Sequence, residues 1–186
     1  MSTFALPQEY PTLESDRLIL RPFTKDDTDT IHRLLSFPHM SDDTPKLPQA
    51  NPEYIAEKWI SQYDALWANG IELNLAVIKR ETNALVGGQC LRFDSINQSA
   101  TLSYWTGYPF WNNGFATEAT QTLVQFAFQT LHLNRIEAHC LMRNDPSIRV
   151  LEHNHFLPEG VQRQAIQHNQ RFEDVAYYGL LINDYR

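Results

Sequence analysis

The sequence has no run of about 18 apolar residues, the length that a membrane-spanning helix requires, so we predict no membrane partner. Cysteine is scarce as well. Cys90 and Cys140 each lie in a strand-like run, and we expect both to be reduced and buried, as in a cytoplasmic protein. The N-terminus lacks a basic start and a long apolar core, so we expect no signal peptide.

Basic residues are fewer than acidic ones. The chain has 15 Lys and Arg against 22 Asp and Glu, a formal charge of −7, which argues against nucleic acid as a general partner. The same balance is compatible with attraction of a cationic ligand. Internal repeats and linkers are absent. With 186 residues, 42% of them hydrophobic, we expect a single domain over 1–186 with an irregular arm at 1–12.

The order of the expected elements predicts a mixed α/β (α+β) domain. Alternating and β-branched runs predict strands at 17–23, 73–78, 85–93, 99–106, 135–141, 160–168 and 172–183. Helical periodicity predicts helices at about 24–36, from 51 to about 66, 113–131 and 145–152. The three strands in the middle form an antiparallel meander. The strands on either side of the third helix should be parallel, with a right-handed crossover.

Between the expected helices, prolines and polar residues predict a long loop at 37–52. Long ordered loops are often functional, so residues 37–70, which are this loop and the helix after it, and the closing hairpin are the expected walls of a ligand pocket. The aromatic stripe that begins the next helix, Tyr54, Ile55, Trp59, Tyr63 and Leu66, can also be plain core packing.

The most distinctive stretch is Tyr104-Trp-Thr-Gly-Tyr-Pro-Phe-Trp-Asn-Asn-Gly-Phe-Ala-Thr-Glu-Ala119, which reads as a strand, a turn and a helix start. Asn112 and Asn113 are good N-cap residues, and Gly114 lets a large anion approach the main chain. The N–H groups of a first helical turn bind phosphate readily. An ordinary capped turn has the same spacing. The stretch is neither a P-loop nor a dinucleotide fingerprint, because Gly-Lys-Ser/Thr and the further glycines are missing.

A second stretch, Arg143-Asn-Asp-Pro-Ser-Ile-Arg-Val-Leu-Glu-His-Asn-His-Phe-Leu-Pro-Glu-Gly160, resembles the closing motif of the GNAT superfamily of N-acetyltransferases. The earlier loop resembles the acyl-CoA site of that superfamily. Together with Leu13-Glu-Ser-Asp-Arg-Leu-Ile-Leu-Arg21, it is similar to the branch that acetylates ribosomal-protein N-termini, the RimJ/RimL type. The chain departs from the pattern at Trp111 (usually Gln or Arg), Asn112 (often Gly) and His155 (usually Gly).

This resemblance implies a GNAT-like acyl-CoA N-acyltransferase fold, with a mixed, mostly antiparallel sheet of about six to seven strands, splayed at its centre and flanked by about four helices. It also implies acetyl-CoA (CoA) as cofactor, with Asn144 contacting the pantetheine arm. The arm would pair with the main chain of Tyr104, Trp105 and Thr106 almost as an added strand. The pyrophosphate would rest on Asn112, Asn113, Gly114, Phe115, Ala116 and Thr117.

The implied reaction is direct attack of a neutral amine on the thioester, so a base must first remove a proton from the ammonium. Ser147 matches the serine that the RimJ/RimL type places three residues after Asn144, and the resemblance implies that it protonates the leaving thiolate. His139 lies where some relatives carry a carboxylate, and a histidine side chain ordinarily titrates near pH 6.5. Glu137 shares its strand face. Ser147 and His139 can also be merely structural.

We therefore expect a RimJ/RimL-like N-acetyltransferase acting on a primary amine, either a protein N-terminus or a small molecule, with no bound metal. The oligomeric state is left open, a homodimer included. A metal site at Cys140, His153 and His155 has only the weak His-x-His signal. The rival hypothesis is a domain that binds acyl-CoA as a sensor or scaffold without turnover. Leu151, which replaces a frequent catalytic Tyr of the superfamily, and the substituted loop motivate it.

Overall fold

A computed structural model describes residues 6–43 and 52–185 of the chain. The strands, which form one sheet in the order β1-β2-β3-β4-β5-β6-β8-β7, are β1 (Leu13–Glu14), β2 (Leu18–Pro22), β3 (Glu72–Lys79), β4 (Ala84–Asp94), β5 (Ser99–Thr106), β6 (Arg135–Leu141), β7 (Leu157–His168) and β8 (Arg171–Leu181). The helices are η1 (Lys25–Asp27), α1 (Thr28–Leu35), α2 (Pro38–Asp43), α3 (Pro52–Ala68), η2 (Tyr108–Phe110), α4 (Phe115–Gln129) and α5 (Asp145–His153).

The predicted antiparallel meander and the parallel crossover are both confirmed. β3, β4 and β5 pair antiparallel in sequence order, and β5 then pairs parallel with β6 after the crossover through α4. The closing hairpin of β7 and β8 is present as well, with β8 inserted next to β6. The sheet has one strand more than predicted because residues 13 and 14 pair with β2 as the short β1. Residues 6–12 have no regular structure, as expected.

One predicted loop is wrong in part. Residues 38–43 form α2, because Pro38 stands at its first position, where a missing N–H costs nothing. Met40, expected in the loop, is buried within that helix. In α3 the most buried described side chains are Ala56 and Trp67, and Trp59, Tyr63 and Leu66 of the expected stripe are half-buried. The predicted contacts of Tyr54 and Ile55, the arm residues 1–5 and the loop segment 44–51 lie outside the described residues.

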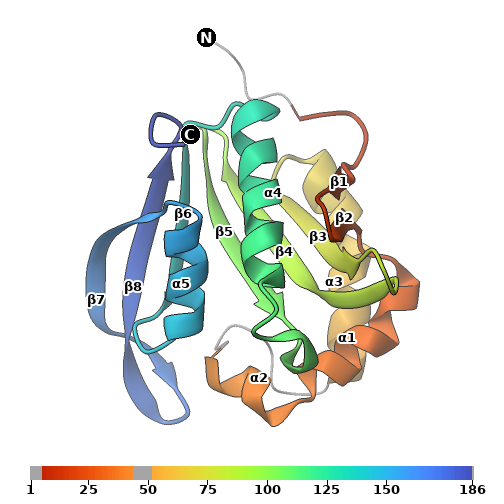
Figure 1. Cartoon of the computed structure of the whole chain (residues 1–186), viewed down its shortest axis with the longest axis horizontal. Coiled ribbons are helices and arrows are strands. Elements are labelled where there is room, and N and C mark those ends of the chain that lie inside the picture. The colour runs from red at the N-terminus through yellow and green to blue at the C-terminus, as the bar shows by residue number, and fades with distance from the viewer. Residues whose placement is uncertain (1–5, 44–51, 186) are drawn as a thin grey trace.

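Helices cover both faces of the sheet. α4 packs on one face over a large apolar cluster that includes its predicted stripe of Leu123, Val124, Ala127, Phe128 and Leu131. α1 and α3 pack on the other face over a smaller cluster that includes Ile31, Leu34 and Ile78. Because β3 is buried from both sides, its sequence is almost continuously apolar rather than alternating. Figure 1 shows α4 and α5 together on the same face.

The sheet opens at its centre. β5 and β6 are paired only from Ser99 with Arg135 to Leu102 with Ala138. β5 then continues to Thr106 beside β4, and β6 continues to Leu141 beside β8, with no pairing between the two strands over these last residues. This is the predicted splay. Over these last residues, the main-chain groups of β5 and β6 do not hydrogen bond to each other. This unpaired end of the two strands lies where α4 begins (Figure 1).

Candidate active site

The turn before α4 presents free main-chain N–H groups. The first main-chain bond of the helix runs from the Glu118 N–H to the Gly114 carbonyl at 3.1 Å. The N–H groups of Phe115, Ala116 and Thr117 precede it and have no acceptor among the described residues. They lie at the positive end of the α4 dipole, so an anion placed before this helix would be stabilised by three donors and the dipole together.

The predicted caps of this helix are wrong. The N-cap is Gly114, in the left-handed conformation (φ +76°), and no side chain caps the helix. Asn112 also has a left-handed backbone (φ +59°), which asparagine tolerates. The Asn113 side-chain amide turns back and donates to the carbonyls of Phe110 (3.2 Å) and Trp111 (2.8 Å). The two asparagines therefore shape the turn rather than cap the helix, which keeps the first N–H groups open.

Arg17, which immediately precedes β2, holds the turn in place. Its guanidinium donates to the Asn113 carbonyl at 3.1 Å and to the Glu118 carboxylate at 2.6 Å. The Ser15 hydroxyl donates to the same carboxylate at 2.7 Å. Burial works to raise the pKa of Glu118, but the hydrogen bonds from Ser15 and Arg17 outweigh it and hold that pKa below its ordinary value. The turn is therefore tied to the start of the chain, with a cation directly beside Gly114.

The unpaired ends of β5 and β6 are separated by a gap, and the end of β5 directs some of its main-chain groups into this gap. The Gly107 N–H donates to the Val86 carbonyl on β4 at 2.9 Å. By the alternation of an antiparallel pair, Trp105 also turns its main-chain groups to β4, opposite Gly88, whereas Tyr104 and Thr106 turn theirs toward β6. The Trp111 indole donates to the Thr106 carbonyl at 2.6 Å, so this substituted residue closes the turn onto β5.

Ser147 lies beside a tyrosine at the start of α5. Asn144 is the N-cap, and its side-chain oxygen accepts from the Ser147 N–H at 3.0 Å. The Ser147 hydroxyl is 2.7 Å from the Tyr104 phenol, which is also 3.1 Å from the Ser147 carbonyl. Burial raises the pKa of the nearby Cys140 thiol, opposed in part by Ser147. Burial raises the pKa of Tyr104, opposed only in part by Ser147, so this phenol stays protonated at neutral pH.

His139 belongs to the opposite face of the sheet. Tyr104, Cys140 and Ile148, beside Ser147, pack against the cluster under α4. His139 precedes Cys140 on β6 and therefore points the other way. Its ring stacks on that of its cross-strand partner Tyr177, with centroids 5.4 Å apart. The gap thus has a hydroxyl pair on the α4 face and an imidazole on the α3 face.

Several residues that organise the site were not predicted to do so. The Asn154 side-chain amide donates to the Thr117 carbonyl at 3.2 Å and ties the end of α5 to the first turn of α4. His155 has a left-handed backbone (φ +65°), which explains why glycine suits that position. Arg17 and Ser15 lie in a stretch that the sequence singled out by resemblance, but their contacts join residues about a hundred positions apart. Tyr104 was predicted only for its main chain.

The site fits the chemistry of a coenzyme with a diphosphate and an amide-bearing arm. A Cβ at Gly114 would meet only the Arg17 guanidinium, at 3.5 Å, so the approach to the main chain is open. The unpaired ends of β5 and β6 can accept an extended arm. Among the described residues, no three His, Cys, Asp or Glu side chains gather so that they could hold a metal ion. No helix within 6–43 and 52–185 is long and apolar enough to cross a membrane.

Comparison with known proteins agrees with this geometry. Residues 17–157 match the family described as acetyltransferase (GNAT) domain. "Uncharacterized N-acetyltransferase p20" of Bacillus licheniformis is 31% identical over 175 residues, which cover 94% of this chain and 98% of that protein. The ribosomal-protein-serine acetyltransferase of Escherichia coli (strain K12) is 29% identical over 92 residues, 50% of this chain and 51% of that protein.

Solved structures share the fold. Mycobacterium smegmatis RimJ in complex with CoA-disulfide has a TM-score of 0.82 at 22% identity, covering 92% of this chain and 88% of that one. At this identity the likeness shows the fold alone, and it confirms the splayed mixed sheet. The family match and the full-length relative place the chain in the GNAT superfamily as an acetyl-CoA-dependent N-acetyltransferase, and its similarity to the ribosomal-protein-serine acetyltransferase agrees with the RimJ/RimL-like branch.

Proposed function

We propose that this enzyme transfers the acetyl group by direct attack of a primary amine within a ternary complex, and that the acceptor is a protein N-terminus or a small-molecule amine. The observation that carries the proposal is the opening between β5 and β6, which has the Ser147 hydroxyl on one face and the His139 imidazole on the other. Two partners can then approach the gap from opposite faces. A covalent acetyl-enzyme is not needed.

The residues around the gap account for coenzyme binding. The turn from Asn112 to Thr117 would hold the diphosphate on its free N–H groups, with Arg17 adding a nearby positive charge. The main-chain groups of Tyr104 and Thr106 would pair with the arm. Asn144 uses its side-chain oxygen to cap α5, so its predicted contact with the arm would come from its Nδ2 group. Acetyl-CoA, when bound there, supplies a thioester carbonyl that an amine can attack.

His139 is the proposed base. An ammonium has no lone pair, so the acceptor must lose a proton before it attacks. Glu137, on the same face, is engaged elsewhere: it accepts from the Thr101 hydroxyl at 3.2 Å and lies 3.6 Å from the Arg135 guanidinium.

Ser147 is the proposed proton donor to the departing sulfur. The Tyr104 phenol has a single hydrogen. In one arrangement the phenol donates to the Ser147 carbonyl, and the Ser147 hydroxyl then donates to the phenol oxygen. In the other arrangement the phenol donates to the Ser147 hydroxyl, whose own proton is then directed toward the gap. Tyr104 therefore acts as a positioning residue that orients this hydroxyl. A main-chain N–H of the diverging strands can stabilise an oxygen that gains negative charge.

The test is a panel of primary amines assayed by thiol release, with steady-state kinetics at varied concentrations of both substrates. We expect intersecting double-reciprocal lines and no acetylated protein by mass spectrometry. Ser147→Ala and His139→Gln should each lower kcat by about 10²- to 10⁴-fold. Ser61→Ala on the exposed face of α3 and His132→Gln in the exposed turn after α4 are matched controls. Parallel lines, or coenzyme binding with no transfer to any amine, would contradict the proposal.

A further inference from the structure

We infer that Trp111 is a positioning residue for the arm of the coenzyme, and that the Thr106 N–H donates to an amide carbonyl of this arm. The inference rests on the proposed coenzyme site and deepens it. Two hydrogen bonds at the end of β5 carry the inference. One runs from the Gly107 N–H to β4, and the other runs from the Trp111 indole to the Thr106 carbonyl.

The last peptide unit of β5 is held at both of its polar groups. This unit joins Thr106 to Gly107. Its N–H donates to the Val86 carbonyl at 2.9 Å, and its carbonyl accepts from the Trp111 Nε1–H at 2.6 Å. The two groups point in opposite directions across the strand, the first toward β4 and the second toward the gap. Because β6 is not paired with β5 here, the indole supplies the donor that a neighbouring strand would otherwise supply.

This bond decides which main-chain group of Thr106 remains for a ligand. Thr106 lies opposite Gly87, and the bond from Gly107 to Val86 shows that this pair turns its main-chain groups outward. Both the N–H and the carbonyl of Thr106 therefore face the gap. The carbonyl already accepts from the indole, so the N–H is the group left for the coenzyme. An arm aligned with β5 as an added strand would offer an amide carbonyl to this N–H.

Glycines on β4 confine the same end of β5 from its other edge. A Cβ at Gly87 would overlap the Trp105 carbonyl oxygen, and a Cβ at Gly88 would lie 2.6 Å from the Trp105 indole nitrogen. Side chains larger than hydrogen are therefore excluded, and the two backbones can approach closely. The end of β5 is held by backbone contact on the β4 edge and by Trp111 on the gap edge.

The indole is itself held by the turn that precedes α4. The Tyr108 ring meets it edge-on, with centroids 5.2 Å apart and an interplanar angle of 68°. The Asn113 side-chain amide donates to the Trp111 carbonyl at 2.8 Å. The direction of the indole N–H is therefore set before any ligand arrives, which lowers the cost of ordering the site on binding. One side chain thus links the proposed diphosphate turn to the strand that receives the arm.

The alternative is that Trp111 only closes the turn. Loss of its N–H would then weaken the diphosphate site as well as the arm site. If the indole positions the Thr106 N–H, the loss is confined to ligands that carry the arm. Two ligands separate these cases: CoA, and the nucleotide half of CoA, which carries the diphosphate without the arm.

The experiment measures calorimetric binding of both ligands to the parent chain and to Trp111→Phe, which keeps an aromatic ring and removes the N–H. We expect the Kd for CoA to rise by about five- to ten-fold, the effect of about one hydrogen bond, and the Kd for the nucleotide half to stay unchanged. In thiol-release assays the KM for acetyl-CoA should rise by a similar factor with kcat nearly constant. Tyr108→Leu keeps the indole but loosens it, and should raise the Kd for CoA by about two- to five-fold.

Trp67→Phe is the matched control. Trp67 is buried in the large apolar cluster, against Tyr10 and Phe93. Phe93 pairs with Ala100 near the start of β5, at the other end of the strand from Trp111. Trp67→Phe should lower the melting temperature and leave the binding of both ligands unchanged.

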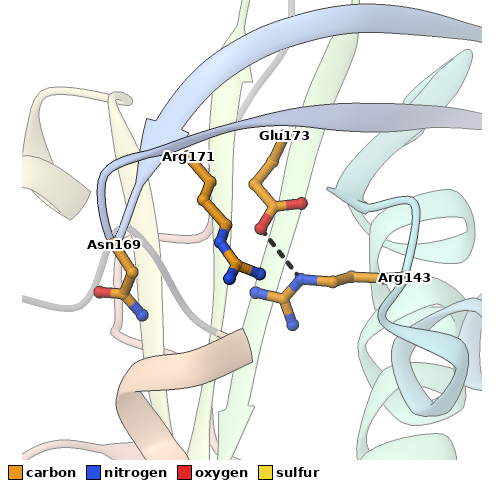
Figure 2. A pocket seen from close by; sticks show the side chains of 4 residues that line it. All are labelled: Arg143, Asn169, Arg171 and Glu173. Carbon is orange, nitrogen blue, oxygen red and sulfur yellow. Dashed lines mark hydrogen bonds and ion pairs between the residues drawn. The ribbon is translucent and has the colours of Figure 1, made fainter.

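A second control concerns another group of donors. Guanidinium groups line a cavity of about 510 Å³ formed by Arg143, Asn169, Arg171 and Glu173. Figure 2 shows Arg171 reaching into it from β8 and Arg143 from the loop between β6 and α5. By the alternation of β8, Arg171 is on the face of Tyr177, opposite to the face that α4 covers. A diphosphate held there would lie away from the first N–H groups of α4, so Arg171→Gln should leave the binding of both ligands unchanged.

Each outcome bears on the inference. Equal weakening of CoA and of its nucleotide half in Trp111→Phe, or unchanged binding of CoA, would overturn the inference and leave the proposed function intact. Weaker binding of the nucleotide half in Arg171→Gln would overturn the inference together with the proposed coenzyme site. Selective weakening of CoA, with no acetyl transfer to any amine by the parent chain, would support the inference and count against the proposed function.

Discussion

Replacing Tyr104 with phenylalanine tests whether a phenol positions the proposed proton donor. The substitution removes one oxygen that lies 2.7 Å from the Ser147 hydroxyl and 3.1 Å from the Ser147 carbonyl. The aromatic ring, which packs in the core under α4, is retained. The Ser147 N–H keeps its hydrogen bond to the Asn144 side-chain oxygen at 3.0 Å. The variant should therefore fold, but with the hydroxyl no longer aimed at the gap.

The size of the effect follows from these contacts. One lost hydrogen bond costs about 1 kcal/mol, so the melting temperature should fall by about 2–4 °C for a chain of this length. If that energy is used to aim the hydroxyl during reaction, kcat should fall by about five- to ten-fold. Ser147→Ala, which removes the proton itself, should lower kcat by about 10²- to 10⁴-fold. The KM for acetyl-CoA should stay nearly constant in both variants.

The assay is steady-state thiol release with the best amine of the panel, measured across pH. Tyr185→Phe is the control, because that ring packs on Phe128 near the C-terminal end of α4. The double variant of Tyr104 and Ser147 should be no slower than Ser147→Ala, since the phenol acts only through the serine. The reasoning is refuted if Tyr104→Phe keeps full kcat while Ser147→Ala is slow, or if the two losses multiply.

Three further perturbations have defined outcomes. Gly114→Ala should lower the free energy of unfolding by about 1 kcal/mol because of the left-handed backbone (φ +76°), and it should weaken CoA binding measured by calorimetry. Gly70→Ala is the control: with φ +67°, it should lower the free energy of unfolding by the same amount without changing CoA binding. Asp27→Asn should lower the free energy of unfolding at pH 7, measured by chemical denaturation, by about 2 kcal/mol, because the carboxylate accepts two hydrogen bonds of 2.8 Å from Arg21. Denaturation measured against pH should show stability falling below about pH 4 in the parent chain, and less so in Asp27→Asn.

The sign of the pH effect follows from the Asp27 carboxyl. Burial works to raise the pKa of Asp27, but hydrogen bonds from Arg21 and Thr24 outweigh it and lower this pKa below its ordinary value. The unfolded chain then binds the proton more readily, so the stabilisation is complete above the ordinary pKa and is lost as pH falls through the lowered one. Glu118 contributes with the same sign. A rise in stability on acidification would contradict the pKa directions given for Asp27 and Glu118. Weaker CoA binding in Gly70→Ala would contradict the prediction made for Gly114→Ala.

Local pattern was enough to predict most of the fold. The runs that became β3, β4 and β5 were found because turn residues separate strongly apolar segments, and Asn83 takes the left-handed conformation that the first turn needs. α2 was missed because proline was interpreted as a helix breaker, although Pro38 stands at a first helical position. The cap of α4 was misplaced because Asn113 satisfies the turn instead of the helix.

The site was predictable only as far as its motifs are local. The turn before α4 and the segment from Asn144 to Ser147 are each continuous in sequence, so both could be assigned by resemblance. The Tyr104 phenol reaches Ser147 across 43 positions, and Ser15 reaches Glu118 across 103, so no local pattern records either contact. The two sides of the gap became distinct only when the strand register placed His139 and Ser147 on opposite faces.

The most direct test is a crystal structure of the chain with acetyl-CoA bound. The diphosphate should lie on the N–H groups of Phe115, Ala116 and Thr117, and the arm should run between β5 and β6 with hydrogen bonds to Tyr104 or Thr106. The Ser147 hydroxyl should lie next to the thioester sulfur. A coenzyme bound elsewhere, or β5 and β6 paired through to Thr106 and Leu141 with no room for the arm, would contradict the account.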